Sequence, residues 1–365
     1  MNYKLLTPGP LTTSAAVKEA MQVDHCTWDE DYKIITQKIR QRLLELAGVS
    51  EEEYTAILMQ GSGSFGVEAV LSSVLGSQDK LLICVNGAYG ERMVQMAKRH
   101  GLSYSSYEVP ENEIPDAAVI QEILQKDAAI TALAMVHSET TSGILNELTE
   151  IAKVVHKADV LFLVDAMSSF GGIPIDVKGL DVDFLISSSN KCIQGVPGFS
   201  FIICKKEALD SSEGNARTVS LDIHDQYKAM AHDGKWRFTS PTHTVLAFEQ
   251  ALKELEEEGG IEVRYTRYLS NNQFLRQKME EIGFEPYIHK HQGPFITSFL
   301  YPKNPAFQFQ TFYSFLKERG YAIYPGKINS LDCFRIGNIG DIYLEDMNNV
   351  TQAIYDYMEE IANEN

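Results

Sequence analysis

The chain has 365 residues, which is more than one ordinary hydrophobic core organises, so two lobes are expected. Hydrophobic residues make up 44% and charged residues 22%, a composition that excludes a small disulfide scaffold and a long disordered tail. The 50 acidic residues outnumber the 32 basic ones by 18, and this net charge of −18 disfavours nucleic acid and anionic membranes as partners.

Strands and helices alternate along the first two thirds of the chain. Short apolar runs, typical of strands buried on both faces, are found at residues 56–59, 80–85, 130–136, 160–164, 184–186 and 199–204. Amphipathic stretches predict helices at 68–75, 90–100, 117–125 and 148–157. This order favours βαβ crossovers around a mostly parallel sheet, so residues 16–258 are predicted to form one large α/β domain.

The last third changes character at Gly259 and Gly260, which separate a predicted helix at 244–258 from a second one at 261–282. Short strands are then predicted at 296–301, 321–324 and 334–336, and helices at 309–319 and 344–360. The mixture predicts a smaller α+β domain over residues 259–365, with residues 1–15 as a separate N-terminal segment near the active site.

Cysteine usage and the N-terminus bear on the compartment. The five cysteines are odd in number and show no C-x-x-C pair or metal-binding spacing, which predicts reduced thiols, a cytoplasmic protein and no metal site. The N-terminus lacks a basic segment followed by a long apolar stretch, and no run approaches the roughly 18 apolar residues that span a bilayer. Neither an export signal nor a membrane anchor is expected.

A glycine-rich turn follows the first predicted strand, where Gly61, Gly63 and Gly66 form a G-x-G-x-x-G pattern that opens a helix. In a dinucleotide enzyme an acidic residue ends the next strand. Here that strand ends at Asn86 and Asp79 precedes it, so a nicotinamide dehydrogenase is the weaker interpretation. Small residues at a helix N-terminus instead favour a single phosphate, with a tight turn that binds nothing as the alternative.

Two polar residues follow two successive apolar strands. Asp165 lies at a strand end, where open α/β sheets bind ligands, although a helix cap or a solvated acid would also explain it. Lys191 follows the strand at 184–186 among small residues, and partial burial would make its amine a nucleophile toward an aldehyde. A structural ion pair of Lys191 with Asp181 or Asp183 is the alternative.

A phosphate site, an acid at a strand end and a shielded lysine together supply what pyridoxal phosphate needs. The lysine would form the Schiff base, and the acid would pair with the protonated pyridine nitrogen and keep the ring an electron sink. Tyr89 follows a strand and could stack on the ring, although a lone aromatic residue more often belongs to a core.

On these residues the chain resembles fold-type I pyridoxal phosphate enzymes and, within them, the class V aminotransferases. The resemblance covers nearly the whole chain and rests on the strings LLTPGPLTT (5–13), CTWDEDY (26–32), QGSGS (60–64), NGAYG (86–90), HSETT (137–141), VDAMSSFGG (164–172), NKCIQGVPGF (190–199) and FRIGNIG (334–340). The strings look most like those of members with 2-aminoethylphosphonate as amino donor and pyruvate as acceptor, so a ping-pong transamination in phosphonate degradation is expected. An alanine–glyoxylate or serine–pyruvate aminotransferase is the closest alternative.

The resemblance implies a role for each matching residue. Lys191 would be the Schiff-base lysine and proton carrier, Asp165 the partner of the pyridinium, and Tyr89 the stacking ring. The residues implied to hold the phosphate are Ser62, Gly63, Ser64 and Asn190. Thr140 would reach the phenolic oxygen of the ring, and Thr239 would touch the phosphate in the neighbouring subunit, so a homodimer with active sites at the interface is expected.

Arg335 is the residue that the resemblance implies for substrate binding. Its planar guanidinium suits a carboxylate and a phosphonate alike, so one arginine would serve both half-reactions. A surface ion pair with Asp332 or Asp341 is the alternative. Cys333 raises the rival interpretation of a cysteine desulfurase, but a free cysteine is usually a small buried hydrophobe.

Two other interpretations are disfavoured. His137 and His243 have no second ligand at metal spacing, and Lys191 is available to move the proton, so both are predicted to pack in the interior or to support residues of the site. A regulator that only binds the cofactor would need a DNA-binding region, which neither the motifs nor the net charge of −18 suggests.

Overall fold

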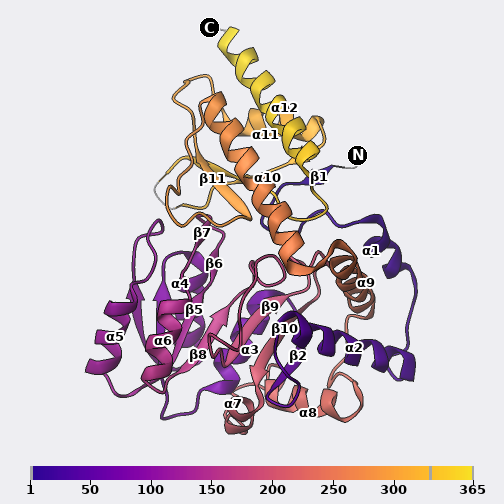
Figure 1. Cartoon of the computed structure of the whole chain (residues 1–365), viewed down its shortest axis with the longest axis vertical. Helices are drawn as coiled ribbons and strands as arrows, with labels where there is room; N and C mark the ends of the chain where they lie inside the picture. The colour runs from indigo at the N-terminus through magenta and orange to yellow at the C-terminus, as the bar shows by residue number, and fades with distance from the viewer. Residues whose placement is uncertain (1–2, 329–330, 364–365) are drawn as a thin grey trace.

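The computed structural model describes residues 3–328 and 331–363; the remaining parts of the predicted domains, residues 1–2, 329–330 and 364–365, lie outside this description. Figure 1 shows a large body built around one broad sheet and, above it, a smaller body formed by the C-terminal third of the chain. None of the helices within the described residues is long and apolar enough to cross a membrane.

Seven strands form the broad sheet. They are β2 (Tyr54–Gln60), β3 (Lys80–Val85), β4 (Ser103–Glu108), β5 (Ile130–Val136), β8 (Leu161–Asp165), β9 (Phe184–Ser188) and β10 (Phe199–Lys205). Their order is β2-β10-β9-β8-β5-β3-β4, and β10 runs antiparallel to both of its neighbours. The other neighbouring pairs are parallel, which confirms the predicted mostly parallel α/β sheet.

Both faces of this sheet are buried, as β5 illustrates. Leu133 and Met135 pack into one apolar cluster, whereas Ala132, Ala134 and Val136 pack into a second one. Successive side chains of a strand point to opposite faces, so a strand covered on both sides needs apolar residues at every position. This is why uninterrupted apolar runs predicted these strands.

Helices cover the two faces of the sheet. Those of the large body are α1 (Ala15–Glu19), the 3-10 helix η1 (Ala20–Gln22), α2 (Glu30–Leu46), α3 (Gly63–Val74), α4 (Ala88–Arg99), α5 (Ala117–Lys126), α6 (Thr149–Lys157), α7 (Lys206–Ser211), α8 (Ile223–Asp233) and α9 (Thr242–Glu258). Helices α2, α5, α6 and α9 contribute to one apolar cluster, and α3, α4 and α7 to the other. Helix α3 begins at Gly63 rather than at residue 68, so Gly63 and Ser64 belong to its first turn.

The smaller body has its own sheet and core. Its elements are α10 (Gly260–Ile282), β11 (Ile296–Leu300), α11 (Phe309–Glu318), β12 (Tyr321–Ala322), β13 (Tyr324–Pro325), β14 (Cys333–Gly337) and α12 (Leu344–Asn363). Strand β14 pairs antiparallel with β11 and with β13. Phe284, Phe299, Phe312 and Phe334 are buried together in an apolar cluster that gathers residues of this body and Leu6.

The prediction of a single strand at residues 321–324 is wrong, because this segment forms two short strands that belong to different sheets. Strand β12 pairs in parallel with β1 (Lys4–Leu5), whereas β13 pairs with β14. Ile323 lies between the two short strands and is buried. Its side chain contributes to the core of the smaller body at the point where the backbone changes pairing partners.

The N-terminal segment is joined to the C-terminal body. Beyond the pairing of β1 with β12, the backbone N–H of Leu6 donates to Ala322 O at 2.8 Å, and the N–H of Gly337 donates to Leu6 O at 2.9 Å. The N–H of Asp341 donates to Thr12 O at 2.8 Å. Residues from the start and the end of the sequence therefore form one structure.

Candidate active site

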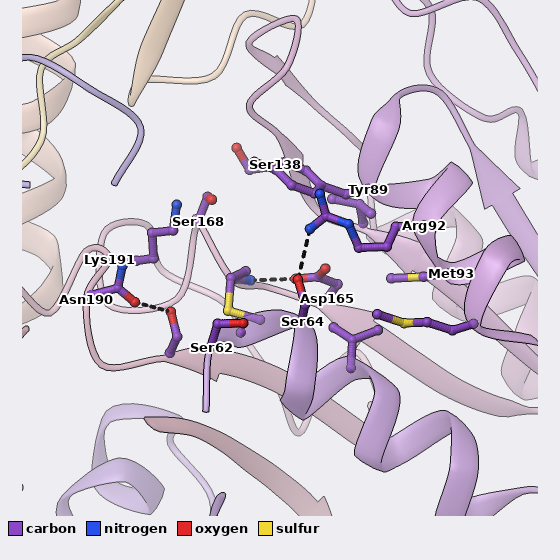
Figure 2. A pocket seen from close by; sticks show the side chains of 16 residues that line it. Ser62, Ser64, Tyr89, Arg92, Met93, Ser138, Asp165, Ser168, Asn190 and Lys191 are labelled. Carbon is purple, nitrogen blue, oxygen red and sulfur yellow. Dashed lines mark hydrogen bonds between the residues drawn. The ribbon is translucent and has the colours of Figure 1, made fainter. Parts of the chain in front are cut away.

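A cavity lies at the carboxyl ends of β5, β8 and β9, the edge at which open α/β sheets bind ligands. Its lining consists of Ser62, Gly63, Ser64, Val67, Tyr89, Arg92, Met93, Met96, Val136, Ser138, Asp165, Met167, Ser168, Ser188, Asn190 and Lys191 (Figure 2). Seven of the predicted site residues are among these, namely Ser62, Gly63, Ser64, Tyr89, Asp165, Asn190 and Lys191. Residues far apart in the sequence thus line one cavity.

The sheet explains how Asp165 and Lys191 reach the same cavity. Strands β8 and β9 are parallel neighbours, and Asp165 at the end of β8 is paired with Ile186 of β9. Lys191 lies in the loop that follows β9. Because parallel neighbours end at the same edge, both residues arrive there although they are far apart along the chain.

Asp165 is a buried acid. Its side chain is 6% exposed, and its Oδ1 accepts a hydrogen bond from the backbone N–H of Met167 at 2.9 Å. Burial raises the pKa of Asp165 to about 6, although the Met167 N–H and the charges of Lys191 and Arg92 act in the opposite direction. This burial excludes a solvated loop acid, and a carboxyl group in such a place is suited to a cationic ring nitrogen.

Lys191 has a lowered pKa. Burial lowers the pKa of its amine to about 8, although the charges of Cys192 and Asp165 oppose this change. The Nζ donates to Pro8 O at 2.6 Å. The alternative partners, Asp181 and Asp183, instead contact Lys205 Nζ at 2.6 and 2.8 Å, so the structural ion pair considered for Lys191 is not formed.

The first turn of α3 forms the next wall of the cavity. Ser62 is the N-cap of the helix, and Gly63 and Ser64 are its first two residues. The backbone N–H groups of this first turn have no partner within the helix and are available at the end of the helix that lines the cavity. A Cβ on Gly63 would lie 2.2 Å from Met167 Sδ, so a larger residue at this position would displace the Met167 side chain. Arg92 Nη1 donates to Ser64 Oγ at 2.8 Å, and this guanidinium adds a cation to a site suited to phosphate.

Tyr89 stands in the first turn of α4 and lines the cavity. The guanidinium carbon of Arg92 lies 5.0 Å from the centre of its ring. Thr140 Oγ1 donates to the Tyr89 hydroxyl at 3.4 Å. The ring is thus held between α4 and the segment that follows β5, where it lines the cavity and also packs against the apolar core.

Thr140 and Arg335 lie beyond the lining of this cavity but are joined to each other. Arg335 is buried on β14, where its Nη1 donates to Thr140 O at 3.0 Å and its Nε donates to Pro325 O at 3.2 Å. Its burial and its carbonyl partners exclude the surface ion pair that was the alternative. The contact joins the smaller body to the Tyr89 wall through Thr140.

Thr239 is a third predicted site residue that does not line this cavity. It is exposed on the segment between α8 and α9. Because its predicted role is in the site of a neighbouring subunit, an exposed position is compatible with that role.

Glu139 is a buried site residue for which the sequence analysis predicts no role. It ends the short strand β6 (Ser138–Glu139), which pairs with β7 (Ile144–Leu145). Its Oε2 accepts from the N–H of Tyr89 at 3.0 Å, and its Oε1 accepts from Thr141 Oγ1. A Cβ on Gly87 would lie 2.4 Å from Glu139 Cγ, so the turn before α4 is shaped around this carboxyl group. Burial raises the pKa of Glu139 to about 7.

The remaining predicted packing residues lie outside the cavity lining. His137 is buried, its Nδ1 is 2.9 Å from Ser169 Oγ, and burial lowers its pKa to about 4. The prediction for His243 is wrong, because this residue is exposed and its Nε2 lies 3.0 Å from Asp24 Oδ1 on the surface. Cys333 is buried, and this burial raises the pKa of its thiol, which disfavours the reactive thiolate that a desulfurase would need.

The large domain with its strand-end lysine and acid, joined to a small domain, has the architecture of fold-type I enzymes, which confirms the predicted fold. Residues 18–337 match the aminotransferase class-V family, and the chain belongs to that family. Over its full length it is 56% identical to a 2-aminoethylphosphonate–pyruvate transaminase of Lysinibacillus sphaericus, covering all of that protein. It is 54% identical to a protein of the same name from Klebsiella pneumoniae, with 97% of each chain covered.

Solved structures show the same fold at lower identity. An alanine–glyoxylate aminotransferase from Nostoc has a TM-score of 0.89 and 24% identity, with 99% of this chain and 96% of that chain covered. A pyridoxamine–pyruvate aminotransferase from Mesorhizobium loti has a TM-score of 0.90 and 22% identity, with 99% and 93% covered. The predicted enzyme class is confirmed, and the cofactor of this transaminase is pyridoxal 5'-phosphate. A buried acid, a lysine and a helix N-terminus around one cavity fit that cofactor.

Proposed function

We propose that this enzyme transfers the amino group of 2-aminoethylphosphonate to pyruvate and thereby forms phosphonoacetaldehyde and L-alanine in phosphonate degradation. The observation that carries the proposal is the 56% identity, over the whole of both chains, to a protein named for this reaction. The buried guanidinium of Arg335 supports it, because both substrates carry an anionic group.

The residues that line the cavity support an assignment of the cofactor-binding groups. When bound, pyridoxal phosphate supplies the electron sink for amino-group transfer. Gly63 and Ser64 bind its phosphate through the first-turn N–H groups of α3, with Ser62 and Asn190 beside them and Arg92 as the local cation. A local cation matters because the net charge of −18 repels anions at long range.

Two residues carry the reaction. Lys191 binds the cofactor through Nζ and moves the proton of the substrate; with its pKa lowered to about 8, a substantial fraction of the amine is neutral near pH 8. Asp165 holds the ring nitrogen protonated, since a buried carboxylate stabilises a neighbouring cation. Tyr89 would stack on the cofactor ring, and Thr140 would reach its phenolic oxygen.

Arg335 binds the phosphonate of the donor and then the carboxylate of the acceptor. Its fixed contacts to Thr140 O and Pro325 O orient the guanidinium plane, which suits bidentate recognition of either anion. One arginine therefore serves both halves of the ping-pong cycle.

The assembly, domain division and location complete the proposal. Two copies form a homodimer in which Thr239 reaches the partner's phosphate site. Residues 16–258 form the cofactor domain and residues 259–365 the small domain, with the break at Gly259 between α9 and α10; residues 1–15 form the N-terminal segment. The five free cysteines support a cytoplasmic location.

The test is an alanine assay on the enzyme loaded with cofactor. With pyruvate as acceptor, alanine should form when 2-aminoethylphosphonate is the donor and should be absent when L-serine replaces it. In the same cuvette, the visible absorbance should bleach with 2-aminoethylphosphonate and return with pyruvate. Turnover with L-serine but not with 2-aminoethylphosphonate as donor, or with glyoxylate in place of pyruvate as acceptor, would instead identify an aminotransferase of the alanine–glyoxylate or serine–pyruvate type.

Replacing Arg335 by alanine should raise the KM for 2-aminoethylphosphonate and for pyruvate together, each by about 10-fold to 100-fold, since a hydrogen bond to a charged group contributes about 1.5–3 kcal/mol. Steady-state kinetics with each substrate varied in turn would measure both. Arg319→Ala, at an exposed arginine, is the control and should leave both constants unchanged. If neither KM rises in Arg335→Ala, this residue does not bind the substrate anion.

A further inference from the structure

The amine of Lys191 lies against the turn formed by Thr7, Pro8 and Gly9, far from it in the sequence. The Nζ donates to Pro8 O at 2.6 Å, a contact between residues 183 positions apart. Gly9 adopts φ +125°, and a Cβ built on it would lie 2.8 Å from Lys191 Nζ, 2.9 Å from Cδ and 3.0 Å from Cε. The lysine side chain thus occupies the space that any other residue at position 9 would need.

We propose that the Pro8 carbonyl and the missing side chain of Gly9 position the amine of Lys191 for reaction with the cofactor. This inference rests on the proposed role of Lys191 in binding pyridoxal phosphate. Pro8 and Gly9 are positioning residues: the first supplies an acceptor that orients Nζ, and the second supplies the clearance that lets the lysine reach it.

The chemistry of the acceptor matters. A carboxylate next to Nζ would stabilise the ammonium form, which cannot attack a carbonyl group. A backbone carbonyl also accepts one N–H bond, but it carries no net charge, so it orients the amine with less stabilisation of the protonated form. The lowered pKa of Lys191 is consistent with this arrangement.

The turn is held in place by the small domain. Thr7 Oγ1 donates to Pro10 O at 2.6 Å and closes the turn on itself. Gly337 of β14 packs directly on the turn: a Cβ on Gly337 would lie 2.5 Å from Thr7 O. The N–H of Gly337 also donates to Leu6 O. The strand that carries Arg335 therefore fixes the turn that contacts Lys191.

The test compares Gly9→Ala with Gly283→Ala. Gly283 is the matched control because it has φ +104° and no atom within 4 Å of a built Cβ, so alanine there adds backbone strain without a clash. Cofactor is removed from each protein and pyridoxal phosphate is added back. Samples are quenched with borohydride at intervals, and the mass of the peptide that contains Lys191 reports how fast the covalent bond forms.

Trapping at Lys191 should be about 100-fold slower in Gly9→Ala than in the wild type, since a misplacement of 1 Å can reduce a rate by that factor. The rate in Gly283→Ala should equal that of the wild type. Equal rates in Gly9→Ala and Gly283→Ala would overturn the inference. No trapping at Lys191 in the wild type would instead overturn the proposed role of this lysine.

A second variant keeps the inference testable if Gly9→Ala does not fold, which circular dichroism would detect. Gly337→Ala displaces the same turn from its opposite side, through Thr7 O. It should slow trapping in the same direction as Gly9→Ala. Because the trapping reaction contains no substrate, an effect of this variant on substrate binding by Arg335 cannot imitate the result. Wild-type trapping in a folded Gly337→Ala protein would contradict the role of the turn.

Discussion

Replacing Lys191 by alanine should lower turnover of 2-aminoethylphosphonate by at least about 1,000-fold, since general acid–base catalysis alone contributes 10²-fold to 10⁴-fold. In the proposed mechanism, the variant loses both the amine that binds the cofactor and the group that moves the proton. The phosphate side of the cavity is unchanged, so pyridoxal phosphate should still bind, but without a covalent bond. Alanine formation measures the first effect, and the absence of borohydride trapping measures the second.

Lys98→Ala is the control for this experiment, because Lys98 is an exposed lysine of α4. It should keep wild-type turnover and wild-type trapping. If Lys191→Ala retains turnover, another residue moves the proton; if it retains trapping, another lysine binds the cofactor.

Replacing Asp165 by asparagine should lower turnover on the order of 100-fold to 1,000-fold, the range found when one group that stabilises developing charge is removed. Asparagine keeps the shape and the Oδ1 that accepts from Met167 N–H. It loses the negative charge that, in the proposed mechanism, holds the ring nitrogen protonated. Turnover at saturating substrate measures the effect, with Asp24→Asn at an almost fully exposed side chain as the control. Unchanged turnover in Asp165→Asn would remove Asp165 from this role.

The same substitution should stabilise the cofactor-free protein. Folding raises the pKa of Asp165 from 3.8 to about 6, so the folded state binds the proton more tightly and loses stability as pH rises through this range. Above pH 6 the charged form destabilises the fold by on the order of 3 kcal/mol, and asparagine removes that effect. The Tm of Asp165→Asn should exceed that of the wild type at pH 8 and equal it near pH 4. A lower Tm at pH 8 would contradict the direction of this pKa shift.

Most strands of the large sheet could be predicted from the sequence because the central strands are buried on both faces and are therefore apolar throughout. Strands β3 and β5 occupy the predicted residues 80–85 and 130–136 without change. Strand β4 was missed because it lies at the sheet edge with the sequence SYSSYE, whose residues are exposed or half-buried. Helix α2 was also missed, although Tyr32, Thr36, Ile39 and Leu43 recur at helical spacing and are buried.

The sequence predicts site residues only where a motif lies at the end of a strand or at the start of a helix. Asp165 and Lys191 each follow an apolar run, and parallel strands bring such positions to one edge. Arg92 and Glu139 act through contacts with Ser64 and Tyr89, which depend on how α3, α4 and β6 pack. No local spacing contains that information, because the paired residues are 28 and 50 positions apart.

The pairing of the N-terminal segment with the last third of the chain determines when the site is complete during synthesis. Strand β1 has no partner until β12 has left the ribosome, and Leu6 and Thr12 await Gly337 and Asp341. The nascent chain can form β8, β9 and the loop with Lys191 well before then, but the turn that contacts the amine is fixed last. Such long-range contacts slow folding. In the proposed mechanism, the amine of Lys191 therefore reaches its final geometry only once the strands of the smaller body have formed.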